Sequence, residues 1–108
     1  MKDKLVYLQD MLDAVAKIES YLSGVDQDMF YDNTEKQDAV IRQFEIIGEA
    51  ANSLRKVMPA DDGLPWTPMI SMRNKLIHEY HGVDLETVWE TARRDLPDLK
   101  EKLKMMLG

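Results

Sequence analysis

The segment RNKLIHEY, residues 73–80, carries four side chains of kinds that bind or transform charged ligands. They are Arg73, Asn74, His78 and Tyr80. A guanidinium is permanently charged and presents several N–H donors, so an arginine in a cleft or at an interface suits an anionic ligand. Because these polar groups lie beside an apolar helix face, the segment is a candidate binding or catalytic site.

The segment is expected to end a helix that starts near Thr67 and Pro68, which suit a helix cap and a first helical residue. At about 100° per residue, the apolar side chains of this helix fall within roughly 60° of one direction. They are Trp66, Met69, Ile70, Leu76 and Ile77. Arg73 points into the middle of this apolar stripe, and Tyr80 follows two turns later on the same face.

Two interpretations of Arg73 remain open at this point. In the first, its methylene stem packs on Leu76 and Ile77 while its charge reaches an edge. In the second, part of the face is a cleft or an oligomer interface that receives an anionic ligand. His78 lies about 140° from Arg73 around the helix, so one ideal helix does not bring them together. Fraying at the helix end, or a second copy across a two-fold axis, would do so, and this geometry favours a site shared by a homodimer.

The rest of the chain also shows helical periodicity. A first helix is expected over residues 3–23, where Gly24 ends the pattern. The stretch VDQDMFYDN is expected to form a loop or a single turn. A third segment, residues 34–57, has apolar residues around more than half of its circumference and should be the most buried helix. Either Thr34 or Asp32 suits its N-cap.

The C-terminal part continues the helical pattern. Gly82 is expected to end the motif helix in a left-handed conformation, and Asp84 to start the last one. Pro97 cannot donate a backbone hydrogen bond, so we expect a kink or a restart capped by Asp95. The predicted fold is all-α, an antiparallel bundle of four to five helices, as a single domain over residues 1–108.

Composition limits the classes of function. The chain of 108 residues has 44% hydrophobic and 31% charged residues, typical of a globular protein. No apolar run approaches the roughly 20 residues of a membrane span, and no signal peptide is evident, so we expect no membrane association. The absence of cysteine fits a cytoplasmic protein. The net charge of -6 argues against a general nucleic-acid coat but permits a small basic pocket.

A metal site is the weaker alternative for this motif. His78 and His81 are three residues apart, but they are the only two histidines of the chain. A zinc ion would need carboxylates from elsewhere. The sequence contains no glycine-rich phosphate loop and no nucleophile elbow. We therefore expect a site with neither metal ion nor cofactor.

Several stretches together resemble the HepT-like branch of the HEPN superfamily. MRNKLIHEYHGVDLETVW has the pattern R-x4-H-x-Y of that branch, with Arg73, His78 and Tyr80 in place. The stretches IIGEAANSL before it, LPW leading into it and DLP after it are similar to the family in order and spacing. The resemblance covers most of the chain, from the third helix to the end.

The resemblance implies a small helical bundle that forms a homodimer, with the arginine and histidine of both protomers at the interface. Many such proteins are metal-independent ribonucleases. HepT-like members are typically toxins paired with a minimal nucleotidyltransferase antitoxin, which transfers AMP from ATP to the motif tyrosine. By this likeness Arg73 and His78 are the expected catalytic residues, Tyr80 the modified residue, and Asn74 a supporting residue that orients His78. The expected substrate is RNA.

A non-catalytic alternative is a helical subunit that binds and regulates the nucleotidyltransferase. The net negative charge supports it, because RNA would be repelled except at a local patch. The partly apolar setting of the motif also supports it, since such a surface suits protein binding.

Overall fold

The computed structural model describes residues 3–58, 66–78 and 83–108, without the side chains of Trp66 and His78. Within these ranges all regular structure is helical. The elements are α1 (Lys4–Leu22), α2 (Gln27–Tyr31), α3 (Thr34–Leu54), α4 (Trp66–His78), α5 (Leu85–Glu90), the π-helical turn η1 (Thr91–Asp95) and α6 (Leu96–Leu107). Counting α5, η1 and α6 as one continuous helix gives five helices in the part described. The predicted all-α class and helix number are confirmed.

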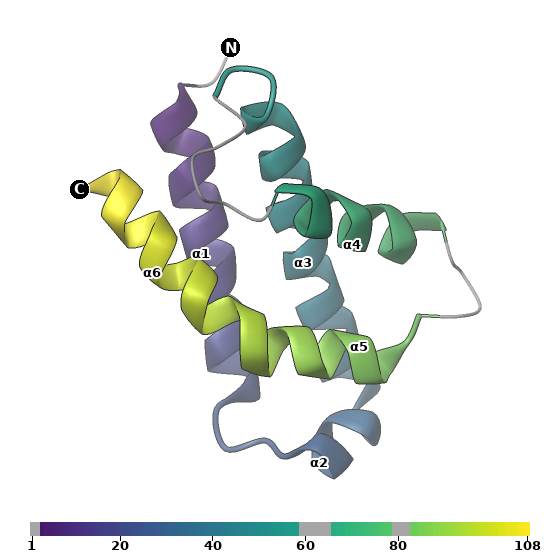
Figure 1. The fold of residues 1–108 in the computed structure, drawn as a ribbon. Helices are drawn as coiled ribbons and strands as arrows, with labels where there is room; N and C mark the ends of the chain where they lie inside the picture. Colours follow the sequence, from purple (N-terminus) through teal and green to yellow (C-terminus); the bar gives the residue numbers. More distant parts are fainter. Residues whose placement is uncertain (1–2, 59–65, 79–82) are drawn as a thin grey trace.

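The longest helices, α1 and α3, run antiparallel and pack along each other (Figure 1). α6 packs against α1, and the short α2 joins the lower ends of α1 and α3. α4 crosses α3 and has its most extensive described contacts with that helix. No described helix is long and apolar enough to cross a membrane.

The core forms where the apolar stripes of these helices meet. α1 contributes a stripe at helical spacing, and α3 contributes a wider face, as their periodicity predicted. The fully buried large side chains are Leu8, Met11, Val15, Ile18, Phe30, Val40, Leu54, Val88 and Leu103. These side chains come from α1, α2, α3, α5 and α6, and Met69 of α4 is buried in the same core.

Helix boundaries agree with the sequence at some ends and differ at others. α1 ends at Leu22, and Gly24 follows with a φ of 72°, a left-handed conformation that glycine adopts without a steric penalty. The N-cap of α3 is Asn33, whose side chain accepts from the backbone N–H of Lys36 at 3.0 Å. The predictions of Thr34 or Asp32 as this cap were therefore wrong. The predicted end of α4 at Gly82 lies outside the described residues.

The chain passes Pro97 through a wide π-helical turn. Proline has no N–H for the carbonyl of Arg93, so the α-helical hydrogen bond at this point cannot form. Residues Thr91–Asp95 form the turn η1, and α6 continues directly after it. The break was predicted, but Asp95 makes no side-chain capping bond, so the expected capped restart was wrong. The wider turn retains hydrogen bonding without a new cap.

Asp84 caps α5, as predicted, and its hydrogen bonds affect its charge. The Thr87 hydroxyl donates to Oδ2 at 2.8 Å, and the backbone N–H groups of Glu86 and Thr87 donate to Oδ1 at 3.0 and 3.3 Å. The hydrogen bond from the Thr87 side chain is the main cause that lowers the pKa of Asp84 below its ordinary value of 3.8. These bonds favour the ionised carboxylate.

Replacing Asp84 by alanine is expected to lower the melting temperature at neutral pH, because the first N–H groups of α5 lose their acceptor. The folded-state pKa of Asp84 is lower than the unfolded one, so its contribution to stability is present above the unfolded pKa. This contribution is lost as the pH falls through the folded-state pKa. Thermal unfolding is measured for both proteins from neutral to strongly acidic pH. The difference between their melting temperatures should become smaller as the pH falls. A difference in melting temperature that does not change with pH would contradict a role for the carboxylate charge.

Candidate functional site

The helix that carries the motif, α4, packs its apolar side against α3. It begins at Trp66, one residue before the predicted cap Thr67. Met69 is buried, while Ile70 and Leu76 are half-buried and pack against the core. These three residues of the predicted stripe therefore face the bundle, whereas Ile77 is half-buried and the side chain of Trp66 is outside the described part.

Arg73 lies on this inward side, with its stem against α3 and its head at an edge. Its Cβ and Cγ pack against Gly48 of α3, where they fill the space that a side chain at position 48 would occupy. Its Nη1 donates a hydrogen bond of 3.0 Å to Oδ1 of Asn74. The Nε atom is buried and has no hydrogen-bond partner among the described residues. The first interpretation placed the stem on Leu76 and Ile77, and its contact with Gly48 was not foreseen.

The structure brings together only part of the predicted site. Asn74 is exposed and contacts Arg73, whereas the sequence suggested His78 as its partner. The backbone of His78 forms the last residue of α4, and its side chain lies outside the described part. Tyr80 and His81 also lie outside it. The roles of Asn74, His78 and Tyr80, and the metal alternative with His81, stay untested.

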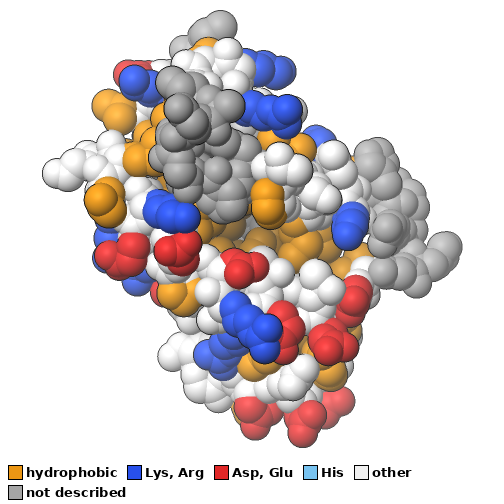
Figure 2. All heavy atoms as spheres, in the orientation of Figure 1, with side chains coloured by type: hydrophobic (Ala, Val, Ile, Leu, Met, Phe, Trp, Pro, Cys, Tyr) orange, Lys and Arg blue, Asp and Glu red, His pale blue; other side chains and the backbone are white. Residues whose placement is uncertain are grey.

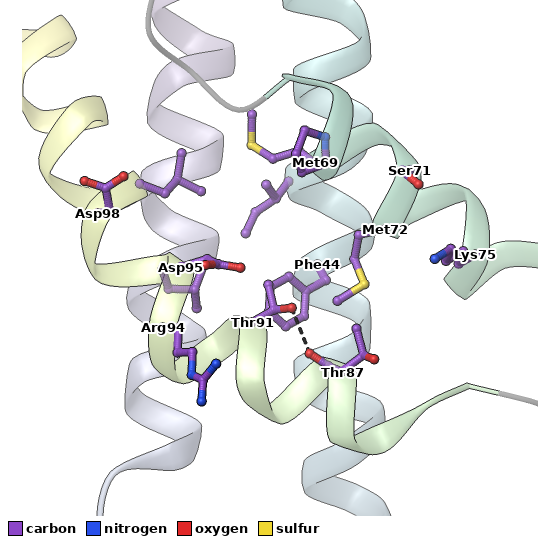
Figure 3. Close-up of a pocket in the computed structure, with 14 residues that line it drawn as sticks. Phe44, Met69, Ser71, Met72, Lys75, Thr87, Thr91, Arg94, Asp95 and Asp98 are labelled. Carbon is purple, nitrogen blue, oxygen red and sulfur yellow. Dashed lines mark hydrogen bonds between the residues drawn. The ribbon is translucent and has the colours of Figure 1, made fainter.

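The other flank of α4 borders a cleft of about 530 Å³, which is lined by residues from α3, α4, α5, η1 and α6. Phe44, Met69 and Met72 face this cleft, with Lys75 on α4 at one side and Arg94 on η1 at the other (Figure 3). Figure 2 shows hydrophobic side chains at the bottom of this hollow, between α4 and α5.

The cleft is separate from the position of Arg73. Lys75 follows Arg73 by two residues, so the two cations point about 160° apart around α4. Arg73 and Asn74, both described, do not line the cleft. Arg73 and Asn74 therefore lie outside the apolar cleft, although the same helix lines it.

Gly48 is the residue of this site that the sequence did not single out. The only signal was a glycine within the apolar pattern of IIGEAANSL, where a glycine indicates a close backbone approach. The periodicity of one helix does not say which residue of another helix it meets, so Arg73 could not be assigned as the neighbour of Gly48.

The protein is an all-α protein with an arginine held between two helices. Comparison with known proteins identifies its family. The family described as "Ribonuclease HepT-like" matches residues 11–106. A "Probable ribonuclease HepT" of Thermococcus cleftensis is 38% identical over 104 residues, covering 93% of this chain and 92% of the relative. The chain belongs to the HepT-like ribonuclease family. The family expectation from the sequence is confirmed.

A second relative has a different length. It is the "Gamma-glutamylcyclotransferase and putative RNase" of Methanocaldococcus jannaschii, 41% identical over 107 residues. The match covers 97% of this chain but 48% of that relative, so the chain spans about half of its length. No solved structure is a significant match to the chain.

Proposed function

We propose that this protein is a metal-independent endoribonuclease toxin whose active site is shared across a homodimer. In this proposal Arg73 and His78 are the catalytic residues, and Asn74 supports them. A minimal nucleotidyltransferase neutralises the toxin by transferring AMP to Tyr80. Membership of the HepT-like ribonuclease family supports RNA as the substrate.

The observation that carries the proposal is the state of the Arg73 guanidinium. Its stem is fixed against α3 and one N–H is bound to Asn74, while its buried Nε has no partner among the described residues. A guanidinium whose N–H donors are only partly used can bind the two oxygens of a phosphate side by side. An RNA phosphate is such a ligand for the outer N–H groups of the guanidinium.

The chemistry follows from the groups assigned. RNA contains its own nucleophile, the 2′-hydroxyl. His78 takes the proton of this hydroxyl as the general base. The oxygen then bonds to the adjacent phosphorus, and the bond from phosphorus to the 5′-oxygen breaks. The His78 of a second copy protonates the leaving oxygen, and Arg73 stabilises the negative charge that develops on the phosphoryl oxygens.

A shared site also fits the surface of α4. Ile70 and Ile77 lie next to Arg73 around the helix and are only half-buried in the single chain. A second copy packed on this flank would cover these apolar groups, and it would supply a histidine that α4 itself cannot place beside Arg73.

The test uses matched substrates in the presence of EDTA. The purified protein is incubated with a defined RNA and with the same RNA methylated at every 2′-oxygen. We expect cleavage of the unmodified RNA alone, with 2′,3′-cyclic phosphate ends, because the methylated substrate lacks the nucleophile. Cleavage of both substrates, or loss of cleavage on chelation, would contradict the proposed mechanism.

The second candidate function is a non-catalytic subunit that binds and regulates a nucleotidyltransferase. The net charge of -6 favours it, because it opposes RNA binding outside a local cationic site. The same incubation separates the two functions, since a docking subunit leaves both RNAs intact.

A further inference from the structure

The contact between α3 and α4 at Gly48 is closer than any other residue would allow. Gly48 is buried in the middle of α3. A methyl group placed on it would overlap Cβ of Arg73, lie 2.8 Å from Cγ of Arg73, and lie 3.0 Å from the backbone oxygen of Met69. The space that a side chain would occupy is therefore filled by the stem of Arg73.

A glycine inside a helix has a conformational disadvantage relative to alanine. Gly48 does not offset this through a left-handed conformation, because the glycines with positive φ in the described residues are Gly24 and Gly108. What its missing side chain provides is room for the first atoms of Arg73.

Both ends of the Arg73 side chain are thus held. The Cβ and Cγ atoms lie against the backbone of α3, and Nη1 is bound to Oδ1 of Asn74 at 3.0 Å. A long flexible side chain that is fixed at its stem and at its head has few remaining rotamers. The direction of the guanidinium is therefore set by α3 as well as by α4.

We infer that Gly48 is a positioning residue, whose missing side chain forms the slot that aims Arg73 at its ligand. The importance of this guanidinium orientation for catalysis rests on the proposed ribonuclease function. The slot itself is a property of the packing, so the two can be tested separately.

The first experiment measures the slot without any activity assay. Melting temperatures are compared for the wild type, Gly48→Ala, Arg73→Gly and the double variant. We expect Gly48→Ala to lower the melting temperature markedly when Arg73 is present. In the Arg73→Gly background it should lower the melting temperature much less, because the closest atom to the methyl group is then the backbone oxygen of Met69, at 3.0 Å. If Gly48→Ala alone does not fold, recovery of folding in the double variant leads to the same conclusion, that the added methyl group is disfavoured mainly by Arg73. An equal loss in both backgrounds would overturn the inference, because Gly48 would then not be accommodating Arg73.

The second experiment tests the orientation of the guanidinium by measuring the kinetics of RNA cleavage in EDTA. We expect Gly48→Ala, assayed below its melting temperature, to lower kcat by about tenfold or more with a smaller change in KM, because Arg73 acts mainly on the transition state. The matched control is Ile47→Val, which removes one methyl group from the adjacent buried position of α3 and should leave kcat unchanged. A similar fall in kcat for both variants would mean that Gly48 has only a general structural role. If the wild type cleaves no RNA, the proposed function fails, while the melting temperatures still decide whether Gly48 forms the slot.

Discussion

Replacing His78 or Arg73 by alanine is expected to reduce RNA cleavage by about a hundredfold or more. A positioned general base contributes about 10²–10⁴ to a rate, and removing one group that stabilises developing charge costs about 10²–10³. His78 is proposed to fill the first role and Arg73 the second. Initial rates of cleavage in EDTA are the measurement. Lys75→Ala is the matched control, because Lys75 is an exposed cation on the same helix that faces the cleft instead.

A mixed dimer tests whether the site is shared. Wild-type and His78→Ala chains carrying different tags are co-expressed, and the heterodimer is purified through both tags. If each protomer had its own complete site, the heterodimer would keep about half of the wild-type activity. A shared site that needs both histidines should keep far less than half. Retention of half of the activity, or a failure to form dimers, would contradict the shared site.

The second large effect concerns Tyr80 and the nucleotidyltransferase. By helical spacing Tyr80 follows Arg73 by two turns, a rise of roughly 10 Å; its placement stays a prediction. An AMP group there would block RNA sterically, and its phosphate would occupy Arg73 in place of the substrate phosphate. Tyr80→Phe is therefore expected to keep the ribonuclease activity and to escape neutralisation. Growth after induction is measured with and without the partner. When the partner is present, growth arrest should persist for Tyr80→Phe and be relieved for the wild type.

Intact mass provides the control for this switch. After co-expression, the wild type should gain one or more AMP units and Tyr80→Phe none. Tyr31→Phe is the matched control, because Tyr31 is an exposed tyrosine on α2, and this variant should still be modified and neutralised. If the partner silences Tyr80→Phe as well, silencing occurs by docking alone and the switch is wrong.

The sequence predicted the long helices well because each has a regular apolar stripe. The expected range of residues 3–23 compares with Lys4–Leu22 in the structure, and the expected start at Asp84 is the cap of α5. The cap of α3 was missed because Asp32, Asn33 and Thr34 are all residues that favour this position. Neighbouring candidates of equal propensity are separated only by the way in which the preceding turn meets the helix.

The outcome at Pro97 shows a different limit. The missing N–H could be read from the sequence, since it is a local property of proline. Whether the chain then kinks, restarts or widens into η1 depends on how Leu96 and Leu99 reach the core. Such packing involves residues far apart in the sequence, which local patterns do not contain.

The sequence predicted the position of Arg73 on its helix, but it did not predict the contacts of this side chain. Arg73 was expected on the buried stripe because one helix defines that angle by itself. The hydrogen bond from Arg73 to Asn74 was not expected, because ideal helical angles place Cβ atoms and ignore the reach of a long side chain that folds back. The slot at Gly48 needed the crossing of two helices, which neither helix specifies alone.

The position of α4 has a consequence for the local stability of the candidate site. The other long helices share one core, whereas the most extensive described contacts of α4 are with α3 alone. Segments with fewer packing partners open at a lower free energy than the whole molecule. We therefore expect the helix that carries Arg73 to open at a lower free energy than α1 and α3. Mild heat or denaturant is then expected to displace Arg73 in a molecule that is still mostly native.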